Sequence, residues 1–411
     1  MKTILITAYA VNPFKGSENG MGWRFVEEAS RAYKVIAITR ENNLPEIHRF
    51  IEEQGSDMHK RVQWVGYDLP TWARWWKKGE WLALFYYVLW QRFMPAFIKK
   101  NNFDFDLVHN LNFHNDWTPS FLWKLNKPFL WGPIGHHPPI PKAFIKPFYG
   151  TKAWLSDRLK TGIKESFRKL IPGLKRTAKE ADHIVAMHPG VAPKLGLPDG
   201  SWTLLPSVGT EWVEPQTTIP QDTFSLISVG RFVPLKGFDI TIRAFAHFYH
   251  ALDATSQQKV KLDLVGKGPS QPLLEALAAQ LGVAHVVSFI PWMDRQDLLE
   301  EYRKAQAFVF PSHEGAGMVV AEALSFGLPV LCLDNVGPGA FVDQDCGMTA
   351  SYKEGYEGAA VTLGKHMLKL HQEPAKREQM AKAARARFES TFDWKAKGVQ
   401  LRSIYANLLA E

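Results

Sequence analysis

The chain has 411 residues, of which 46% are hydrophobic and 22% are charged, which is typical of a globular protein of two or three domains and excludes a disordered or fibrous chain. Only two cysteines, Cys332 and Cys346, are present, which excludes a disulfide framework and a cysteine-rich zinc module and fits a reducing cytosol. A net charge of +8 with 15 tryptophans fits an anionic ligand, a membrane surface or a nucleic acid.

The first half of the chain alternates short apolar runs with helical patterns. The N-terminal run is short and lacks a small-residue cleavage site, so we expect no secretory signal, and we expect no membrane-spanning helix. Buried strands are predicted at residues 3–9, 34–39, 62–67, 105–111, 128–131, 183–187 and 203–205, with helices such as 22–32 and 44–54 between the early ones. This alternation predicts a parallel sheet covered by helices on both faces.

Two segments of this half carry unusual composition. Residues 72–100 hold ten aromatic side chains flanked by lysines and arginines, and their fully apolar centre, residues 81–90, is too short to cross a bilayer. Residues 142–179 contain eleven Lys/Arg against two acids, a local charge of +9. Residues 72–100 could form a helix pair packed into the core, and residues 142–179 could form a solvated basic surface. Alternatively, either segment could contact a membrane at its interface.

A polar stretch with two prolines, residues 211–221, predicts a linker, after which the alternation restarts. Strands are predicted at 224–230, 261–265, 286–290, 307–310 and 329–333, with helices at 238–252, 271–282, 294–304 and 318–326. We therefore expect an α/β protein of two Rossmann-like, doubly wound domains facing a cleft, with ligands at the carboxyl ends of the strands.

The loop that follows the strand 224–230 carries two cations. Arg231 and Lys236 come directly after Gly230, before a predicted helix. Arginine binds oxygen pairs in a bidentate manner and lysine supplies a compact charge, so together they suit a diphosphate better than a single carboxylate. The alternative is a solvated surface pair.

A second loop, after the strand 307–310, leads into a helix that begins near Met318. Free amides at such a helix start attract anions. Glu314 precedes the helix, and Glu322 lies about one turn inside it, where a carboxylate would accept hydrogen bonds from sugar hydroxyls. The alternative for each glutamate is an ordinary capping or solvated role.

The spacing of Glu314 and Glu322, with the upstream Arg231 and Lys236, resembles the retaining glycosyltransferases of family 4. The similar stretches are SVGRFVPLKGFD (228–239), LDLVGKGP (262–269), FIPWMDRQDLLEEY (289–302) and FPSHEGAGMVVAEALSFGLPV (310–330), with weaker similarity in GSENGMGW (16–23) and DLVHNLNFH (106–114). The resemblance implies the GT-B arrangement: an acceptor domain at 1–210, a nucleotide-sugar donor domain at 211–394, and a last helix of about 395–411 that returns to the first domain.

The resemblance also implies roles for single residues. Arg231, Lys236 and Glu314 would be catalytic, with the two cations on the diphosphate and Glu314 at the transferred sugar. The donor would further contact Gly20 and Gly22 of the first domain, Gly230, Trp292 and Met293 at the base, Gly317, Met318 and Val319 at the helix start, and Glu322 at the ribose. Four histidines remain open as acceptor-side residues: His109, His114, His136 and His137.

Charge stabilisation by cations and helix amides would make a metal and a separate cofactor unnecessary, with a UDP- or GDP-sugar as substrate. Because no unassigned carboxylate stands out as a nucleophile, we expect retention by front-face attack. Rival hypotheses are a nucleotide-sugar epimerase or phosphorylase of the same fold, a nucleic-acid-binding protein, and a sugar-binding protein without activity. We expect a cytoplasmic enzyme that acts on a glycan or lipid-linked acceptor, peripheral at the inner membrane face, with no nucleic-acid partner.

Overall fold

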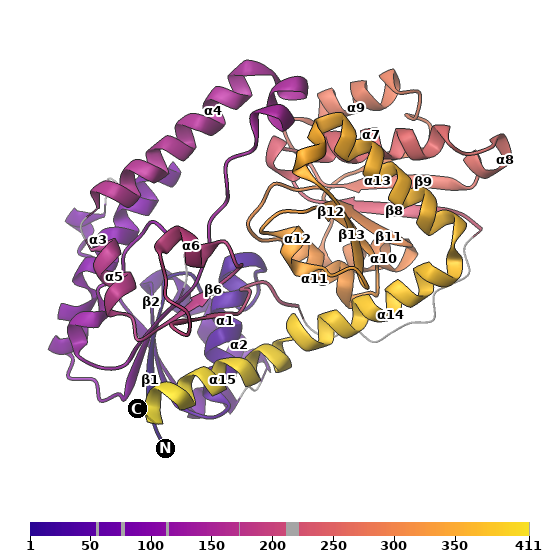
Figure 1. Ribbon diagram of the computed structural model, residues 1–411. Coiled ribbons are helices and arrows are strands. Elements are labelled where there is room, and N and C mark those ends of the chain that lie inside the picture. The colour runs from indigo at the N-terminus through magenta and orange to yellow at the C-terminus, as the bar shows by residue number, and fades with distance from the viewer. Residues whose placement is uncertain (55–56, 75–78, 112–114, 172, 211–221, 411) are drawn as a thin grey trace. The chain divides into compact units, whose positions relative to one another are not determined.

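The computed structural model describes residues 1–54, 57–74, 79–111, 115–171, 173–210 and 222–410 (Figure 1). The chain divides into two compact units. The first unit contains residues 1–136, 162–208 and 394–411, and the second contains residues 137–161 and 209–393. Each unit is built around one parallel sheet.

The first unit has a seven-stranded sheet with the order β3-β2-β1-β4-β5-β6-β7. Its strand residues alternate between two apolar cores, because successive side chains of a strand point to opposite faces. Ile4 and Ile6 belong to one core, and Leu5 and Tyr9 belong to the other. The strands are β1 (Thr3–Ala8), β2 (Lys34–Thr39), β3 (Val62–Gly66), β4 (Leu107–Leu111), β5 (Phe129–Ile134), β6 (His183–Ala186) and β7 (Trp202–Leu204).

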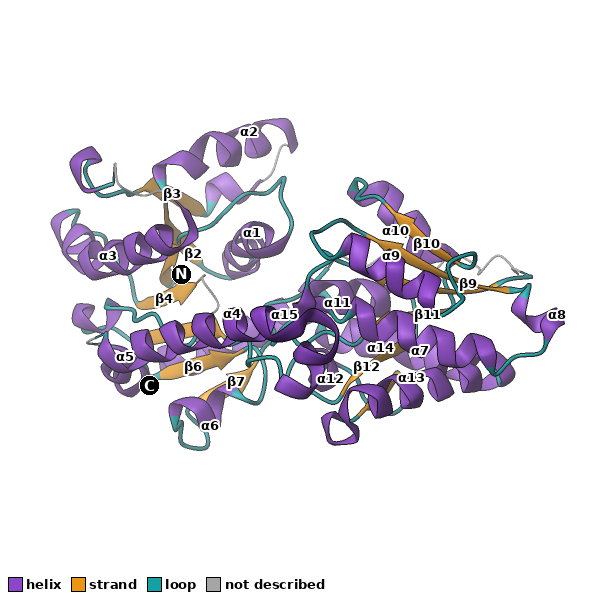
Figure 2. Cartoon of the chain, turned by 90° about the horizontal axis from the view of Figure 1, so that it is seen from above, coloured by secondary structure: helices purple, strands orange, loops and turns teal. Residues whose placement is uncertain are grey.

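Helices cover both faces of this sheet, as predicted. Figure 2 shows α1 and α3 on opposite sides of the strands, and their apolar residues belong to the two different cores. The last helix, α15, packs beside α1. The helices of this unit are α1 (Ser17–Ser30), α2 (Leu44–Gln54), α3 (Gly79–Lys100), α5 (Leu174–Glu180), α6 (Val191–Leu195) and α15 (Trp394–Ala410).

The second unit repeats the same winding in a six-stranded sheet with the order β10-β9-β8-β11-β12-β13. All of its strand pairs are parallel. The strands are β8 (Phe224–Val229), β9 (Val260–Val265), β10 (Val287–Ile290), β11 (Ala307–Phe310), β12 (Val330–Leu333) and β13 (Gly347–Ala350). The helices are α7 (Phe238–His250), α8 (Ala254–Gln257), α9 (Gln271–Gln280), α10 (Arg295–Lys304), α11 (Met318–Ser325), α12 (Pro338–Phe341), α13 (Gly355–Gln372) and α14 (Pro374–Thr391).

Residues 137–161 pack with the second unit, which corrects the predicted boundary at 210. They include the first part of α4 (Lys142–Leu170), a helix interrupted at Gly150, where φ is 80° and ψ is 178°. Phe144 and Ile145 are buried in the core of the second unit. Tyr149 donates a hydrogen bond to Asp239 of α7 over 3.1 Å. These contacts join residues far apart in sequence, so local sequence patterns do not predict them.

The aromatic segment at residues 72–100 divides between core and surface. Along α3, one face is buried in the first unit and includes Tyr86, Tyr87 and Trp90. Trp90 donates its ring N–H to the carbonyl of Tyr67 over 2.8 Å. The opposite face exposes Leu82, Phe85 and Phe93, and Trp72 is exposed before the helix. Trp75, Trp76 and the side chain of Trp81 lie outside the described residues. No helix in the described ranges is long and apolar enough to cross a membrane.

The packing of residues 137–161 predicts a stability effect confined to the second unit. We expect Phe144→Ala to destabilise it by about 3–5 kcal/mol, because the truncated ring leaves a cavity in a closely packed core. Hydrogen exchange of the β8–β13 amides measures the change. The exposed Leu159 of the same helix provides the control, since Leu159→Ala removes no buried area. If Phe144→Ala weakened protection in β1–β7 and left β8–β13 unchanged, the assignment of this segment would be wrong.

Candidate active site

The candidate site of the second unit lies where β8 and β11 end. These two strands are neighbours in the sheet, and the chain continues from β8 to β9 on one side and from β11 to β12 on the other. Such a reversal of strand order is where doubly wound folds bind ligands. The predicted loops with Arg231 and Lys236 and with Glu314 follow these two strands, so the structure brings them to the same edge of the sheet.

The two loops fit closely against each other. The carbonyl of Leu235 accepts a 2.9 Å hydrogen bond from the backbone of His313 and a 3.1 Å bond from the hydroxyl of Ser312. Gly237 has a φ of +70°, and a Cβ atom there would lie 2.2 Å from the carbonyl oxygen of Pro311. Only glycine therefore allows this approach without displacing the backbone.

Lys236 and Glu314 form an ion pair across the two loops. The ammonium nitrogen lies 2.8 Å from each carboxylate oxygen of Glu314. Both side chains are mostly buried, with exposed fractions of 15% and 13%. The structure thus brings together the predicted cation and the predicted sugar-binding carboxylate. Arg231, in contrast, is exposed and forms no side-chain hydrogen bond or ion pair among the described residues.

The helix α11 begins shortly after Glu314, so its N-terminus follows this ion pair in the chain. Gly317 precedes Met318 and Val319, and no side chain caps the helix. Asn335 holds the neighbouring loops, since it donates to the carbonyl of Ser312 over 2.6 Å and accepts from the amides of Gly337 and Gly339, each over 3.1 Å. An uncapped helix start with fixed surroundings is suited to an anion.

Two histidines contribute to the same loop region. His313, which the sequence analysis did not single out, is buried, and burial lowers its pKa to about 3. Its Nδ1 lies 2.7 Å from the hydroxyl of Tyr352, so it is a neutral packing residue. His137 was predicted on the acceptor side, but it belongs to the second unit, and its Nδ1 accepts a 3.0 Å hydrogen bond from the backbone of Gly315.

Glu322 lies within α11 and is buried. Burial raises the pKa of its carboxyl, against the opposing effect of Arg295. Arg295 donates to one carboxylate oxygen over 3.1 Å, and the hydroxyl of Tyr302 lies 3.5 Å from the other. The sequence analysis missed Arg295. It follows the predicted base-binding residues Trp292, which is exposed, and Met293, which is half-buried.

Gly20, which precedes the helix predicted at 22–32, and Gly22, its predicted first residue, both lie inside α1, because this helix begins at Ser17. Asn12 donates its backbone N–H to the carbonyl of Asn19, which folds the preceding loop onto the helix. A Cβ atom at Gly20 would lie 2.3 Å from the carbonyl oxygen of Lys15. Gly20 is therefore required by the packing of this loop.

His109 is a core residue of the first unit. It is fully buried, and burial lowers its pKa to about 4. Its Nδ1 lies 2.7 Å from the hydroxyl of Tyr405 and its Nε2 lies 2.7 Å from the carbonyl of Gly132. Because the protein occupies both ring nitrogens, the predicted acceptor role is not supported. His114 lies outside the described residues.

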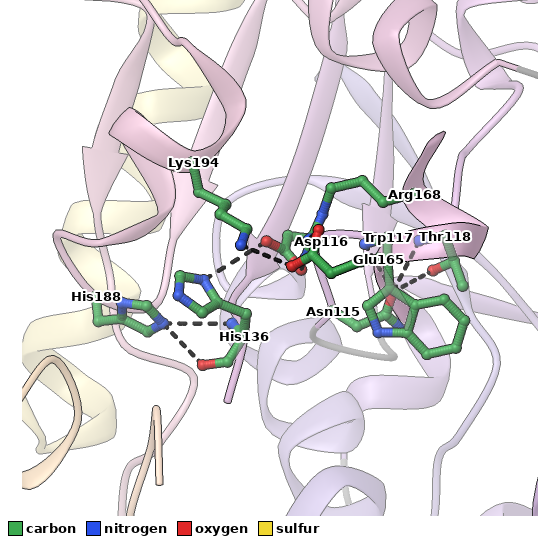
Figure 3. Close-up of polar contacts among 9 residues, drawn as sticks. All are labelled: Asn115, Asp116, Trp117, Thr118, His136, Glu165, Arg168, His188 and Lys194. Carbon is green, nitrogen blue, oxygen red and sulfur yellow. Dashed lines mark hydrogen bonds and ion pairs between the residues drawn. The ribbon is translucent and has the colours of Figure 1, made fainter. Parts of the chain in front are cut away.

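His136 belongs to a polar cluster at the carboxyl ends of β4, β5 and β6 (Figure 3). Its Nδ1 lies 3.5 Å from the fully buried carboxylate of Asp116. Its ring packs against that of His188, with centroids 4.7 Å apart. Asp116 accepts a 2.7 Å hydrogen bond from Arg168. Because these residues are far apart in sequence, no local pattern predicts the cluster.

The charges of this cluster alternate in sign. Arg168 also pairs with Glu165, which in turn lies 2.8 Å from the ammonium of Lys194. Hydrogen bonds from Arg168 and Lys194 lower the pKa of Glu165 to about 2, whereas burial raises the pKa of Asp116. Across the parts of the chain that the structure describes, no group of three or more His, Cys, Asp and Glu side chains is arranged to hold a metal ion.

Most of the second unit is similar in sequence to a known protein family. Residues 211–387 match the family model described as "Glycosyl transferases group 1". A D-inositol 3-phosphate glycosyltransferase of Thermomonospora curvata is 31% identical over 262 residues, which cover 61% of this chain and 57% of that protein. The chain thus spans somewhat more than half the length of this relative.

Two solved structures share the fold of nearly the whole chain. Sucrose-phosphate synthase of Thermosynechococcus elongatus has a TM-score of 0.64 at 19% identity and full coverage of both chains. HepE of Anabaena, solved in complex with UDP, has a TM-score of 0.61 at 14% identity, with coverage of 99% and 100%. The two parallel sheets are therefore those of the GT-B fold, and residues 211–387 are similar to the glycosyl transferases of group 1.

Proposed function

We propose that the protein is a glycosyltransferase that moves a sugar from a nucleotide-diphosphate donor to a hydroxyl acceptor, in polysaccharide, lipopolysaccharide or glycolipid assembly. The observation that carries this proposal is the Lys236–Glu314 ion pair beside the uncapped start of α11. The relative's name and the UDP bound to HepE support it. A UDP- or GDP-sugar is the proposed donor.

The arrangement suits the charge changes of sugar transfer. Breaking the bond between sugar and diphosphate places negative charge on the leaving oxygen. Arg231, Lys236 and the amides of Met318 and Val319 would stabilise this charge without reorganising. Because Glu314 already holds the ammonium of Lys236, the same carboxylate would keep the lysine in place and face the transferred sugar.

The first prediction for this site concerns nucleotide binding. At a concentration of 100 times its dissociation constant, the UDP or GDP that fits should stabilise the protein by about 2.7 kcal/mol. Arg231→Ala and Lys236→Ala should each reduce this thermal shift and lower transfer by about a hundredfold, because each removes one preorganised donor to the diphosphate. Arg243→Ala, a change of an arginine on α7 that pairs with Glu357, is the control. Near-normal turnover in both folded site variants would contradict the assignment.

The stereochemical proposal is retention without a metal. Front-face attack requires no protein nucleophile, and the departing diphosphate takes the acceptor's proton, so the bond to the new oxygen forms as the old one breaks. Proton NMR of the isolated product should show the donor's anomeric configuration, and a chelator should leave the rate unchanged. An inverted product, or a rate lost with chelator and restored by manganese, would refute the respective part.

We also propose that the enzyme is cytoplasmic and binds the inner membrane face peripherally through the exposed face of α3. Arg92 and Lys99 of the same helix lie near two cations from other elements, Lys124 of the turn Leu122–Leu125 and Arg176 of α5. Burial and then the charges of Arg92, Arg176 and Lys99 lower the pKa of Lys124, so these cations repel one another. Such a concentration of positive charge beside exposed apolar side chains favours anionic lipid.

The basic segment at residues 142–179 does not belong to a single unit. Its eleven cations divide between the units, with five before residue 162 and six after it. Of these six, Arg168 is paired with Asp116 and Glu165. Only part of the predicted charge of +9 therefore belongs to the unit that carries α3.

Binding to vesicles tests this surface. The protein should cosediment with anionic vesicles, in part sensitive to salt, because each cation contributes about 1 kcal/mol that salt screens. Phe85→Ser with Phe93→Ser should weaken the salt-resistant part, and Arg92→Gln with Lys124→Gln the salt-sensitive part. Leu273→Ser, which changes an exposed residue of the second unit, is the control. If the protein did not bind anionic vesicles even at low salt, the membrane proposal would be wrong and the acceptor would be a soluble molecule.

A further inference from the structure

We propose that Arg295 is a positioning residue of the nucleotide site, which holds the Glu322 carboxylate charged and oriented toward the hydroxyl pair of a ribose. This inference rests on the proposed function and extends it to a residue that neither the family match nor the sequence resemblance assigns. The ligand class is a ribonucleoside diphosphate, and the feature recognised is its neighbouring pair of sugar hydroxyls.

The geometry fixes Arg295 by two different partners. One guanidinium nitrogen donates to the carboxylate of Glu322 over 3.1 Å, and the other donates to the hydroxyl of Thr210 over 2.8 Å. Thr210 is itself held, because its backbone N–H donates to the carbonyl of Phe392. The guanidinium is therefore tethered between a buried acid and a fixed backbone segment, although 54% of the arginine side chain is exposed.

The position of Arg295 is unfavourable for the helix that carries it. Arg295 is the first residue of α10, directly after the capping residue Asp294. The start of a helix carries partial positive charge, so a cation there is less favourable than an acid. A residue whose charge is unfavourable at its position in a helix is expected where the function of the protein requires that residue. The hydrogen bond from Arg295 to Glu322 is the reason for an arginine at this position.

The carboxylate of Glu322 keeps capacity for a ligand. An ionised carboxylate offers about four acceptor positions, and Arg295 and Tyr302 take two of them, the second at a long 3.5 Å. In the ionised state the carboxylate accepts from both hydroxyls of a ribose. A protonated carboxyl has lost one acceptor position to its own hydrogen, so binding depends on the charge that Arg295 maintains.

The surroundings of Glu322 contain few other charges. From α10 come Arg295 and Tyr302. From α14, Arg385 donates to the carbonyl of Ser325 at the far end of α11 and pairs with Glu389 of its own helix. The adjoining strands β11 and β12 contribute apolar side chains and Cys332. Burial raises the pKa of Glu322 and Arg295 lowers it. Without Arg295, only the hydrogen bond from Tyr302 opposes the effect of burial on the pKa of Glu322, so its protonation moves to higher pH.

The experiment measures nucleotide affinity by calorimetry from about pH 8 down to about pH 6, with UDP and GDP as probes. In Arg295→Met the affinity should fall about tenfold as the pH is lowered, and the fall should begin at a higher pH than in the wild type. Arg295→Lys should restore part of the affinity at low pH. Lys304→Met removes a cation from the same helix that pairs with Glu301, and it should follow the wild type. The ligand's own phosphate titrates identically in all four proteins.

A second measurement needs no ligand. Arg295→Met, Glu322→Gln and the double variant form a cycle of thermal stabilities, in which the double variant should be more stable than Arg295→Met because no buried charge remains unpaired. Equal affinity of Arg295→Met and wild type at every pH, or a loss that is the same at every pH, would overturn the proposal. If the cycle showed coupling while the wild type bound neither nucleotide, the proposed function would be wrong and the role toward a ribose would fall with it.

Discussion

The close approach of the loops after β8 and β11 is the constraint on which the candidate site depends. Gly237 meets the carbonyl of Pro311, where a side chain would collide with the backbone, and the loops are then joined by hydrogen bonds to Leu235. This approach brings the ammonium of Lys236 to the carboxylate of Glu314, two residues separated by almost eighty positions. The ion pair is a consequence of backbone fit, because a long lysine and a glutamate on freely moving loops would lose more rotamer entropy than their attraction returns.

Three of the buried acids, Glu322, Asp116 and Asp239, show two kinds of compensation. Glu322 and Asp116 are each paired with an arginine, and each arginine also contacts a second residue that fixes its position. Asp239 is instead surrounded by the hydroxyls of Tyr149 and Tyr356, and burial raises its pKa to about 6. A tyrosine partner accommodates protonation more easily than an arginine does. The arginine pairs therefore mark the acids whose negative charge the fold maintains.

Much of the fold follows from local pattern. Apolar runs such as those of β1 and β8 are buried on both faces and stand between helical segments, so the parallel sheets could be predicted, and with them the shared edge that holds Lys236 and Glu314. Features set by distant contacts could not. The predicted start of α1 is also too late: the helix begins at Ser17, and Gly20 inside it leaves no room for a Cβ atom beside the carbonyl of Lys15. From the sequence, His109 is one of four histidines open on the acceptor side, and only its contacts with Tyr405 and Gly132 show that it is a core residue. Arg295 leaves one local signal, a cation at a helix start, which gains meaning only with Glu322 beside it.

Charge counted along the chain differs from charge on a surface. The segment with a local charge of +9 divides between two units, and Arg168 within it is consumed by Asp116 and Glu165. Of the cations beside α3, Arg92 and Lys99 belong to α3 itself, Lys124 belongs to the turn at Leu122–Leu125, and Arg176 of α5 is a member of that segment. Arg92, Lys124 and Arg176 lie over the rings of Phe121 and Trp123. Aromatic faces stabilise cations that would otherwise repel one another. The fold therefore assembles this electropositive surface from several elements, and of its four cations only Arg176 belongs to the segment where positive charge is densest.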